Sequence, residues 1–390
     1  MPQTRALREF LAAEVLGAVV LLAVTVVAVT WANSPWQDGY HHLWANDLTV
    51  ALGRWELSLD LREWVNEGLM AIFFFVVGLE VKRELVQGEL RERRKAALPV
   101  IAALGGMVVP AAIFAIVNVR GPGGDGWGIP MATDIAFALG ALALLAPGIS
   151  SSGRVFLLAL AIVDDIGAIV VIAVFYSSSI SWTPLGIAAV LVVAVLALQR
   201  LRVPYTAAYV AIGVGLWLAL HDAGIHATIA GVVMGVLTPT GPMGRRHTVA
   251  PAERLEHLLH PWTSFVVIPL FALANAGITL SGGSLRDALT SRVGVGVLAG
   301  LVAGKTIGIS GAAWLARRTG VAELPDDVSP RQMVGLAALG GIGFTVSLFI
   351  TGLAFDGELV TDATVGVFAG SILATALAFV LLRSRVNAPA

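Results

Sequence analysis

Four ionisable residues of this 390-residue chain lie inside long apolar segments, where charged side chains are rare. They are Asp134, the adjacent pair Asp164 and Asp165, and Lys305. A charge at the centre of a lipid bilayer costs at least about 2.5–3.5 kcal/mol on insertion scales, so such residues usually serve a function. Three carboxylates and one amine can bind a cation and exchange it for protons. This chemistry predicts an ion-binding site buried in a membrane.

The two adjacent aspartates cannot serve the same face of a helix. Asp164 and Asp165 lie within the apolar run Leu157 to Val174, and consecutive helical side chains diverge by about 100°. We expect one of them to face the segment that contains Asp134 while the other points elsewhere. A carboxylate in a low-dielectric site holds a proton or a cation, but not comfortably both. Competition between the two is the logic of ion exchange.

Lys305 lies beside a stripe of small residues. Glycines recur there every four residues, at Gly296, Gly300, Gly304 and Gly308. This spacing allows a second helix to approach closely, so the amine of Lys305 is expected near a neighbouring helix. A buried ammonium needs a carboxylate partner, and Asp164 or Asp165 is the candidate. The alternative, in which Lys305 extends to the membrane surface, is disfavoured by the apolar residues on both sides of it.

The composition indicates a helical membrane protein. The chain is 57% hydrophobic and only 13% charged, against roughly 25% charged residues in soluble domains, and its mean hydropathy is +0.84. It contains no cysteine, which excludes disulfides, thiolate metal sites and thiol redox chemistry. We therefore expect residues 1–390 to form a single integral membrane domain. Its first apolar run, Val15 to Trp31, is nearer the length of a membrane span than of a signal peptide.

The apolar stretches predict twelve transmembrane helices. They lie near 14–32, 65–81, 96–117, 129–147, 155–176, 182–199, 204–220, 223–238, 260–278, 291–316, 332–352 and 360–382. If both termini are cytoplasmic, nineteen Lys and Arg residues fall inside and five outside, with Lys305 buried. This asymmetry follows the positive-inside rule. The sequence thus predicts a multi-pass protein of the inner (plasma) membrane with both termini in the cytoplasm.

Two of the expected spans are interrupted. The fourth contains Gly128 and Pro130 just before Thr133-Asp134, and the eleventh contains Gly335 and the run Gly340 to Gly343. Broken helices at matching places in two halves are typical of inverted-repeat transporters, so spans 3–5 are expected to match spans 10–12. Close helix packing at glycine is the alternative explanation. The polar pair Thr133-Asp134 at one break favours a binding site.

The segment between the first two spans has a strand pattern. β-favouring residues of 48–60 flank Gly53-Arg54, which predicts a short external β-hairpin. Isolated hairpins are marginally stable in water, so this one is expected to pair with another element, for which a second copy of itself is one candidate. An ordinary external loop is the alternative.

A second polar cluster borders the cytoplasm. Acidic, basic and histidine side chains end the second span and precede the ninth: Glu80, Lys82, Arg83 and Glu84, then Glu253, Arg254, Glu256, His257 and His260. Histidines among carboxylates titrate between pH 5 and 8, which suits a cytoplasmic funnel with a pH response. A solvated charged rim is the alternative for most of these residues. His226 is expected to be structural or interfacial.

Other motifs are absent or out of context. The glycine-rich run 121–126 matches the dinucleotide-binding pattern, but no strand precedes it and an apolar span follows. No P-loop, HExxH or GxSxG motif occurs, and no basic-aromatic patch indicates nucleic acid. We expect no cofactor and no enzymatic activity.

At these same residues the chain resembles the NhaA family of bacterial sodium/proton antiporters, a family of inverted-repeat transporters with broken helices. The matching stretches run in one order along the chain: FFFVVGLEVKREL (73–85), MATDIAFALG (131–140), AIVDDIGAIVVIA (161–173), GIHATIAGV (224–232), RLEHLLHPW (254–262), PLFALANAG (269–277) and GIGFTVSLFI (341–350).

The resemblance implies roles for the residues already identified. Thr133, Asp134 and Asp165 would surround Na⁺ or Li⁺, so Asp134 and Asp165 are the expected metal ligands, and Asp164 would form a proton-coupled ion pair with Lys305. The funnel and pH response would fall to Glu80, Arg83, Glu84, Glu256, His257 and His260. The hairpin would join two subunits into a homodimer. Glu253 departs from the basic residue expected there, which affects the pH profile.

Two other functions would require features that the sequence lacks. A sodium-coupled symporter for an organic solute would need a roomier polar pocket at mid-membrane. An intramembrane aspartyl protease would need a GxGD motif, which Pro122 breaks before Gly123-Gly124-Asp125. The sequence therefore favours an electrogenic antiporter that exchanges cytoplasmic Na⁺ or Li⁺ for external H⁺, with two protons per sodium implied by the family.

Overall fold

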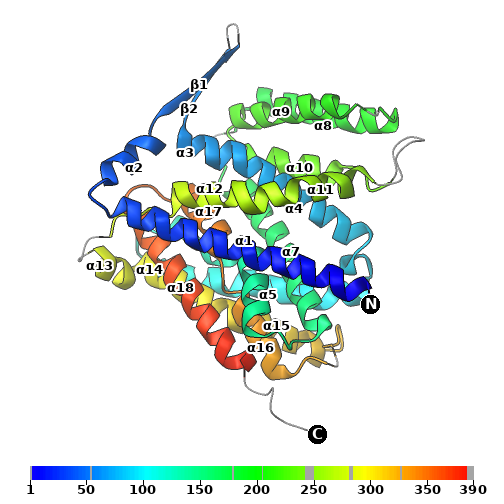
Figure 1. Ribbon diagram of the computed structural model, residues 1–390, viewed down its shortest axis with the longest axis vertical. Helices are drawn as coiled ribbons and strands as arrows, with labels where there is room; N and C mark the ends of the chain where they lie inside the picture. Colours follow the sequence, from blue (N-terminus) through cyan, green and yellow to red (C-terminus); the bar gives the residue numbers. More distant parts are fainter. Residues whose placement is uncertain are drawn as a thin grey trace. The chain divides into compact units, whose positions relative to one another are not determined.

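The described part of the chain is mostly helical, with one two-stranded sheet. The computed structural model describes residues 2–52, 55–177, 180–203, 205–241, 250–280, 284–325 and 327–383, and its elements are labelled in Figure 1. In chain order they are α1 (Pro2–Ala32), α2 (Gln37–Trp44), β1 (Asp47–Leu52), β2 (Trp55–Asp60), α3 (Leu61–Glu63), η1 (Trp64–Leu69), α4 (Met70–Val86), η2 (Glu89–Arg91), α5 (Arg93–Asn118), η3 (Gly124–Met131), α6 (Ile135–Leu145), α7 (Ser151–Phe175), α8 (Trp182–Arg200), α9 (Thr206–Asp222), α10 (Thr228–Leu237), α11 (Pro251–Trp262), η4 (Thr263–Val267), α12 (Ile268–Asn275), α13 (Ser284–Thr290), α14 (Arg292–Ala299), η5 (Gly300–Gly304), α15 (Lys305–Arg318), α16 (Pro330–Leu339), α17 (Phe344–Ala354) and α18 (Glu358–Arg383).

Within the described residues, seven helices are long and apolar enough to cross a membrane, or nine if each of two bent pairs is one span. The bent pairs are η3 with α6, at 44°, and α16 with α17, at 46°. The predicted interruptions of the fourth and eleventh spans are therefore confirmed. A multi-pass helical membrane protein follows from these lengths.

Two predicted spans begin elsewhere in the structure. The eighth, expected over 223–238, is helical only from Thr228 to Leu237, because the chain turns through Gly224, which has a positive φ of 76°. The ninth, expected from residue 260, begins at Pro251 and continues to Asn275. A proline suits the first turn of a helix, where its missing N–H is not needed. Glu256, His257 and His260 therefore lie within this helix and not in a preceding loop.

The chain divides into two compact units. Unit 1 comprises Met1–Asn33, Glu92–Ala168 and Asn275–Ala390, and unit 2 comprises Ser34–Arg91 and Ile169–Ala274. Asp134, Asp164, Asp165 and Lys305 all belong to unit 1.

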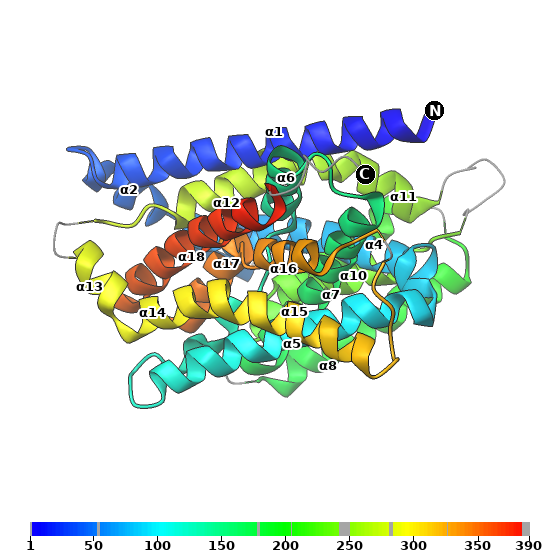
Figure 2. The ribbon, with the colours of Figure 1, turned by 90° about the horizontal axis from the view of Figure 1, so that it is seen from below.

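Unit 1 is built around the glycine stripe that precedes and follows Lys305. The stripe packs against α5, and Figure 2 shows α5 and α15 running side by side. A Cβ atom at Gly304 would lie 2.7 Å from the Cα of Pro110, and one at Gly308 would lie 2.2 Å from the Gly105 carbonyl oxygen. Only glycine permits this approach, so the predicted close helix contact is confirmed, and its partner is α5. The rest of the unit's core is mainly aliphatic, and includes the fully buried Leu157 and Leu336.

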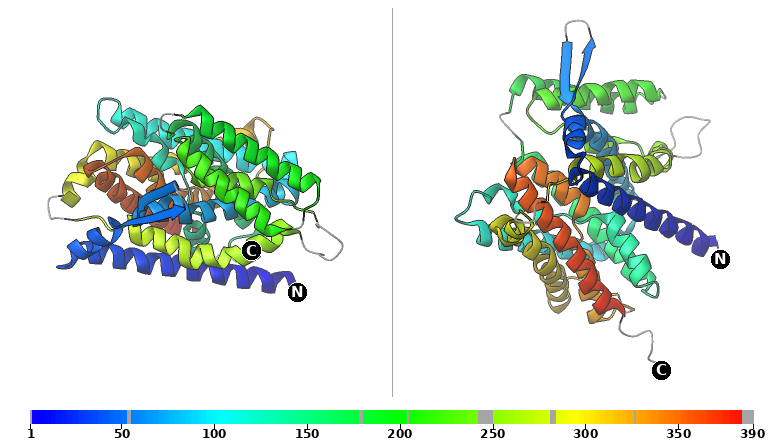
Figure 3. Two further views of the ribbon diagram at one scale, coloured as in Figure 1. Left: turned by 90° about the horizontal axis from the view of Figure 1, so that it is seen from above. Right: turned by 60° about the vertical axis from the view of Figure 1, so that its left-hand side comes forward.

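Unit 2 contains the β-hairpin and a second glycine-mediated helix contact. Strands β1 and β2 pair antiparallel from Asp47–Asp60 to Leu52–Trp55, as predicted, while the Gly53-Arg54 turn lies outside the described residues. Helix α10 crosses α4 with backbone against backbone, because a Cβ at Gly231 would lie 2.0 Å from a carbonyl oxygen of α4. Helices α8 and α9 pack together beside them (Figure 3).

Candidate functional site

The two broken spans meet at their interruptions, and the backbone joins them. The Asp134 N–H, at the break before α6, donates a hydrogen bond of 2.6 Å to the carbonyl of Ile342, at the break before α17. Two helix N-termini, those of α6 and α17, therefore come together inside unit 1. Each carries unpaired N–H groups and a partial positive charge. Such a pair of ends requires a buried negative group.

Asp134 supplies that group. Its Oδ1 accepts from the Phe137 N–H at 3.0 Å, and its Oδ2 accepts from the Thr345 N–H at 3.0 Å and the Thr345 hydroxyl at 2.6 Å. The side chain is only 3% exposed. One carboxylate thus caps two helices at once, and capping by an acid at a helix N-terminus is favourable.

The opposite ends at the break, which expose carbonyl oxygens, are satisfied by hydroxyl groups. Thr133 Oγ1 lies 2.7 Å from the carbonyl oxygen of Gly340, at the end of α16. The Ser347 hydroxyl donates to the carbonyl of Ile129, near the end of η3, at 2.7 Å. Unwound backbone at membrane depth is tolerated only when its polar groups are satisfied in this way. Each broken span therefore supplies hydrogen-bond partners for the backbone groups that the other span leaves unpaired.

Thr133 also connects the break to α7. Its hydroxyl lies 2.5 Å from Asp164 Oδ2, and the same oxygen accepts from the ammonium of Lys305. Lys305 is fully buried and Asp164 is 1% exposed. Within the described residues, Asp164 Oδ1 is buried without a hydrogen-bond partner. A buried carboxylate oxygen in that state can accept a water molecule or a cation.

The helix that carries Lys305 is distorted directly before it. The π-helical segment η5, Gly300–Gly304, ends where α15 begins at Lys305. Insertions of this kind occur frequently at functional sites because they rotate the following side chain relative to the preceding turns. Here Lys305 faces α7.

Asp165 completes the cluster as a third buried acid. It is 5% exposed and follows Asp164 in α7. In the part of the chain that the structure describes, Lys305 is the only buried basic side chain. Asp134, Asp164 and Asp165 therefore share a single positive charge. Unbalanced buried carboxylates are costly, so such a cluster favours protons or a metal cation.

The donor types fit a hard monovalent cation better than a transition metal. Among the described residues, no group of three or more His, Cys, Asp or Glu side chains could hold a metal ion. The cluster instead offers carboxylate, hydroxyl and backbone carbonyl oxygens, the ligands that hard cations prefer. This chemistry suits a cation that binds and leaves.

A separate polar cluster lies at the end of α4, within unit 2. The guanidinium of Arg83 donates to the Glu256 carboxylate and lies 3.7 Å from Glu84. Glu256 is buried, and Glu80 and His260 are partly buried, whereas His257 and Glu253 are exposed. The structure therefore brings Arg83, Glu84 and Glu256 together.

Two residues of the site are not among those predicted from the sequence. Thr345 and Ser347 sit in the first turn of α17, just after the glycine-rich break. Their signal was the alternation of polar residues within GFTVS (343–347), in an otherwise apolar segment. The glycines mark where the helix is interrupted, whereas these two hydroxyls make the side-chain hydrogen bonds that join the two interrupted spans.

Comparisons with known proteins agree on one family. Residues 8–382 match the family model described as Na+/H+ antiporter 1. The chain is 45% identical to Na(+)/H(+) antiporter NhaA 3 of Frankia alni, over 98% of this chain and 89% of that protein. It is 46% identical to Na(+)/H(+) antiporter NhaA of Salmonella arizonae, over 92% of both. It is 44% identical to Na(+)/H(+) antiporter NhaA 2 of Clostridium beijerinckii, over 88% and 85%.

Proposed function

Because this chain belongs to the NhaA family of Na⁺/H⁺ antiporters, we propose that it expels cytoplasmic Na⁺, or Li⁺, in exchange for external H⁺. The observation that supports this function is the charge imbalance of the buried cluster. Three buried acids and one buried amine lie in unit 1, so the fully ionised cluster has two negative charges in excess, which a metal ion or protons reduce in competition with each other.

The ion site is assigned to Asp165, Asp134 and Thr133. Asp165 supplies carboxylate oxygens, and the Thr133 hydroxyl and carbonyls of the two breaks complete the coordination. Asp134 adds negative charge while it caps α6 and α17. Its contribution is therefore mainly electrostatic, since its oxygens already accept three hydrogen bonds.

Proton coupling is assigned to Asp164 and Lys305 together with Asp165. Lys305 donates to Asp164 in the structure. In the proposed cycle an arriving Na⁺ displaces one proton from Asp165 and a second from Lys305, whose pair with Asp164 opens. Na⁺ leaves on the external side, and two protons return the site to its starting state. One net charge then moves per cycle, worth about 2.3 kcal/mol per 100 mV of membrane potential.

The same proposal includes the setting of the protein. It is placed in the inner membrane as twelve spans with both termini cytoplasmic, and with spans 3–5 and 10–12 as inverted repeats. The cluster of Glu80, Arg83, Glu84, Glu256, His257 and His260 is assigned to the cytoplasmic funnel and its pH response. The exposed hairpin is assigned to a homodimer contact.

A proteoliposome exchange assay tests the ion site. Asp165→Asn should abolish the Na⁺-driven dissipation of a pH gradient, because the amide cannot alternate between a proton and a cation. Asp356→Asn, a matched change at an exposed aspartate of unit 1, should transport at the wild-type rate. Exchange at the normal rate by Asp165→Asn would contradict the assignment of Asp165 to the ion site.

A second variant tests the coupling pair. Lys305→Ala should change the dependence of transport on pH, because one of the two protonation steps is removed. An unaltered pH profile would contradict the role given to Asp164 and Lys305. The stoichiometry is measured on the wild-type protein from the Na⁺ and H⁺ gradients at which exchange stops, at different imposed membrane potentials. With two protons per sodium this balance point depends on the membrane potential, and with one proton per sodium it does not.

A further inference from the structure

A proline inside α5 leaves one backbone carbonyl without its usual partner. Pro110 is buried within this helix, which runs from Arg93 to Asn118. Proline has no N–H, so it cannot donate the hydrogen bond that the carbonyl four residues earlier normally accepts. In α5 that carbonyl belongs to Gly106. The sequence thus places an acceptor without its helical donor in the middle of an apolar helix.

This carbonyl lies beside Lys305. A Cβ atom at Gly106 would lie 3.7 Å from Lys305 Cδ, and one at Gly304 would lie 3.1 Å from the Pro110 nitrogen. Helical carbonyls point along the helix toward the residue four positions later, so the Gly106 carbonyl points toward Pro110, where α5 contacts Gly304. The ammonium of Lys305 lies beyond Cδ at the end of a flexible stem. It can therefore reach this carbonyl by rotation of its side chain alone.

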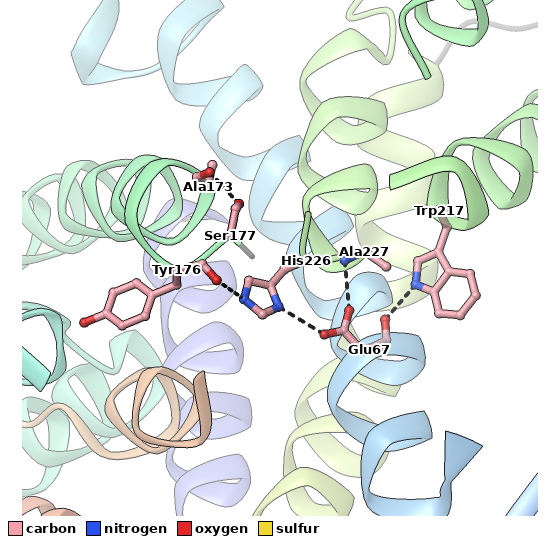
Figure 4. Close-up of polar contacts among 7 residues, drawn as sticks. All are labelled: Glu67, Ala173, Tyr176, Ser177, Trp217, His226 and Ala227. Carbon is pink, nitrogen blue, oxygen red and sulfur yellow. Dashed lines mark hydrogen bonds and ion pairs between the residues drawn. The ribbon is translucent and has the colours of Figure 1, made fainter. Parts of the chain in front are cut away.

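Two backbone groups at helix ends in unit 2 show how such groups are usually paired by side chains. In Figure 4, the Glu67 carboxylate accepts from the Ala227 N–H at 2.9 Å, and the Ser177 hydroxyl donates to the Ala173 carbonyl at 2.7 Å. No described side chain donates to the Gly106 carbonyl. An unpaired carbonyl costs free energy in an apolar environment, and backbone groups freed at membrane depth take partners from neighbouring helices.

The ammonium of Lys305 has donors to spare. It is fully buried and carries three N–H groups. Within the described residues Asp164 is its hydrogen-bond partner, so the ammonium has donors that are not used. A surplus donor on α15 and an acceptor without a partner on α5 therefore lie next to each other, on two helices that run side by side (Figure 2).

The neighbouring acids do not offer Lys305 a second position. Asp134 already accepts three hydrogen bonds where it caps α6 and α17. In the proposed function, Asp165 holds the cation at the time when the Asp164–Lys305 pair is open. After its first turn, α5 carries no ionisable side chain. The Gly106 carbonyl is therefore the acceptor that remains for the amine.

We propose that the Gly106 carbonyl is a second acceptor for Lys305, which binds the amine while its pair with Asp164 is open. Pro110 is then a positioning residue, because its missing N–H keeps the carbonyl available. The inference deepens the proposed antiport function and rests on the opening of the ion pair in that cycle. A carbonyl binds an ammonium more strongly than a neutral amine, so this contact also influences when Lys305 releases its proton.

Reversible unfolding of single and double variants tests the second acceptor without measuring transport. Pro110→Ala returns an N–H that pairs with the Gly106 carbonyl. With Asp164 present, Lys305 is held by the carboxylate, so the variant reports only changes in packing and helix propensity. In Asp164→Ala, Lys305 depends on the carbonyl, and the new N–H competes for it. Pro110→Ala should therefore raise the unfolding equilibrium constant about three- to tenfold more in Asp164→Ala than in the wild type, the size of one hydrogen bond.

A second proline of the same helix provides the matched control. Pro99 is also buried inside α5, and its missing N–H frees the carbonyl of Lys95, an exposed residue in the first turn. Pro99→Ala should change the unfolding equilibrium constant by the same factor in both backgrounds. Loss of the Pro110 ring from its contact with Gly304 is common to both backgrounds, so it cancels in the comparison.

The pH dependence of exchange by Pro110→Ala gives a measurement that does not require Asp164→Ala to fold. Without the carbonyl, the amine that has left Asp164 gives up its proton more readily. The pH at which exchange in proteoliposomes is half-maximal should therefore fall by about half to one pH unit. Pro99→Ala should match the wild type. An unchanged pH dependence of Pro110→Ala would overturn the role of this carbonyl in transport.

The proposed function and the second acceptor can fail separately. If Pro110→Ala has the same effect on unfolding in the wild type and in Asp164→Ala, the carbonyl does not bind Lys305, whatever the transport assay shows. If the two substitutions are coupled in unfolding but the wild-type protein does not exchange Na⁺ for H⁺, the proposed function is wrong and the second acceptor stands.

Discussion

The buried pair of Asp164 and Lys305 gives the strongest quantitative prediction. Both side chains are at most 1% exposed, and Lys305 donates to Asp164 Oδ2. Removing one partner of a buried ion pair leaves an uncompensated charge and costs about 3–5 kcal/mol, whereas replacing both partners with neutral groups is often close to neutral. Lys305→Met and Asp164→Asn should each be strongly destabilising, and the double variant should be less so than either.

The magnitude follows from what each variant leaves behind. Lys305→Met leaves Asp164 with the Thr133 hydroxyl at 2.5 Å and, among the described residues, no hydrogen-bond partner for Oδ1. A loss of about 3–5 kcal/mol corresponds to a factor of about 10²–10³·⁵ in the unfolding equilibrium, at 1.4 kcal/mol per factor of ten. The double variant removes both charges, so the coupling energy should exceed about 2 kcal/mol.

Reversible unfolding of the purified protein in mixed micelles measures this coupling. Thr306→Val serves as the control, because its hydroxyl donates within its own helix, to Val302 at 2.6 Å, and it should shift stability by less than about 1 kcal/mol. If the two single effects add within about 0.5 kcal/mol in the double variant, the sites are independent. The argument that Lys305 compensates Asp164 would then be wrong.

Three further variants probe the contacts around the breaks and the helix crossings. Thr345→Val, which removes the hydroxyl bonded to the capping carboxylate, should lower the free energy of unfolding by about 1.5–3 kcal/mol, and Thr345→Ser should restore most of it. Arg83→Gln should lower the free energy of unfolding by no more than about 1 kcal/mol, because the Arg83 side chain is 40% exposed. It should nevertheless shift the pH dependence of transport, because Glu256 loses its basic partner. An unchanged pH dependence would show that this pair does not control the pH response. Gly231→Ala places a methyl group 2.0 Å from a carbonyl oxygen and should lower the free energy of unfolding by about 1–3 kcal/mol. Gly213→Ala, where the nearest atom to the added methyl group lies at 3.6 Å, should be tolerated. Thermal denaturation compares the two variants.

The sequence was sufficient to identify where the buried charges lie and how one helix approaches them. Ionisable residues in apolar runs are costly enough to be informative by themselves, and the four-residue glycine period predicted the close contact that α5 makes. The hairpin and both interruptions also followed from local patterns, because β-branched alternation and helix-breaking residues act over short distances.

The sequence could not decide which aspartate meets Lys305. Neighbouring side chains on α7 diverge by about 100°, so the choice depends on the rotation of α7 relative to α15, which tertiary packing sets. The same holds for Asp134, whose three hydrogen bonds come partly from a segment far along the chain. The start of α10 was misplaced for a local reason, since the turn at Gly224 interrupts an apolar run.

The mutual capping of the interrupted spans has a consequence for biosynthesis. Asp134 and Thr345 are separated by 211 residues, and Ile129 and Ser347 by 218. A ribosome therefore delivers the first interrupted span to the bilayer long before the groups that complete it exist. Until the C-terminal half arrives, that span needs temporary partners from water, the translocation machinery or a chaperone. Truncation after α15 should consequently leave the N-terminal half exposed to membrane quality control, even though all of its own helices are present.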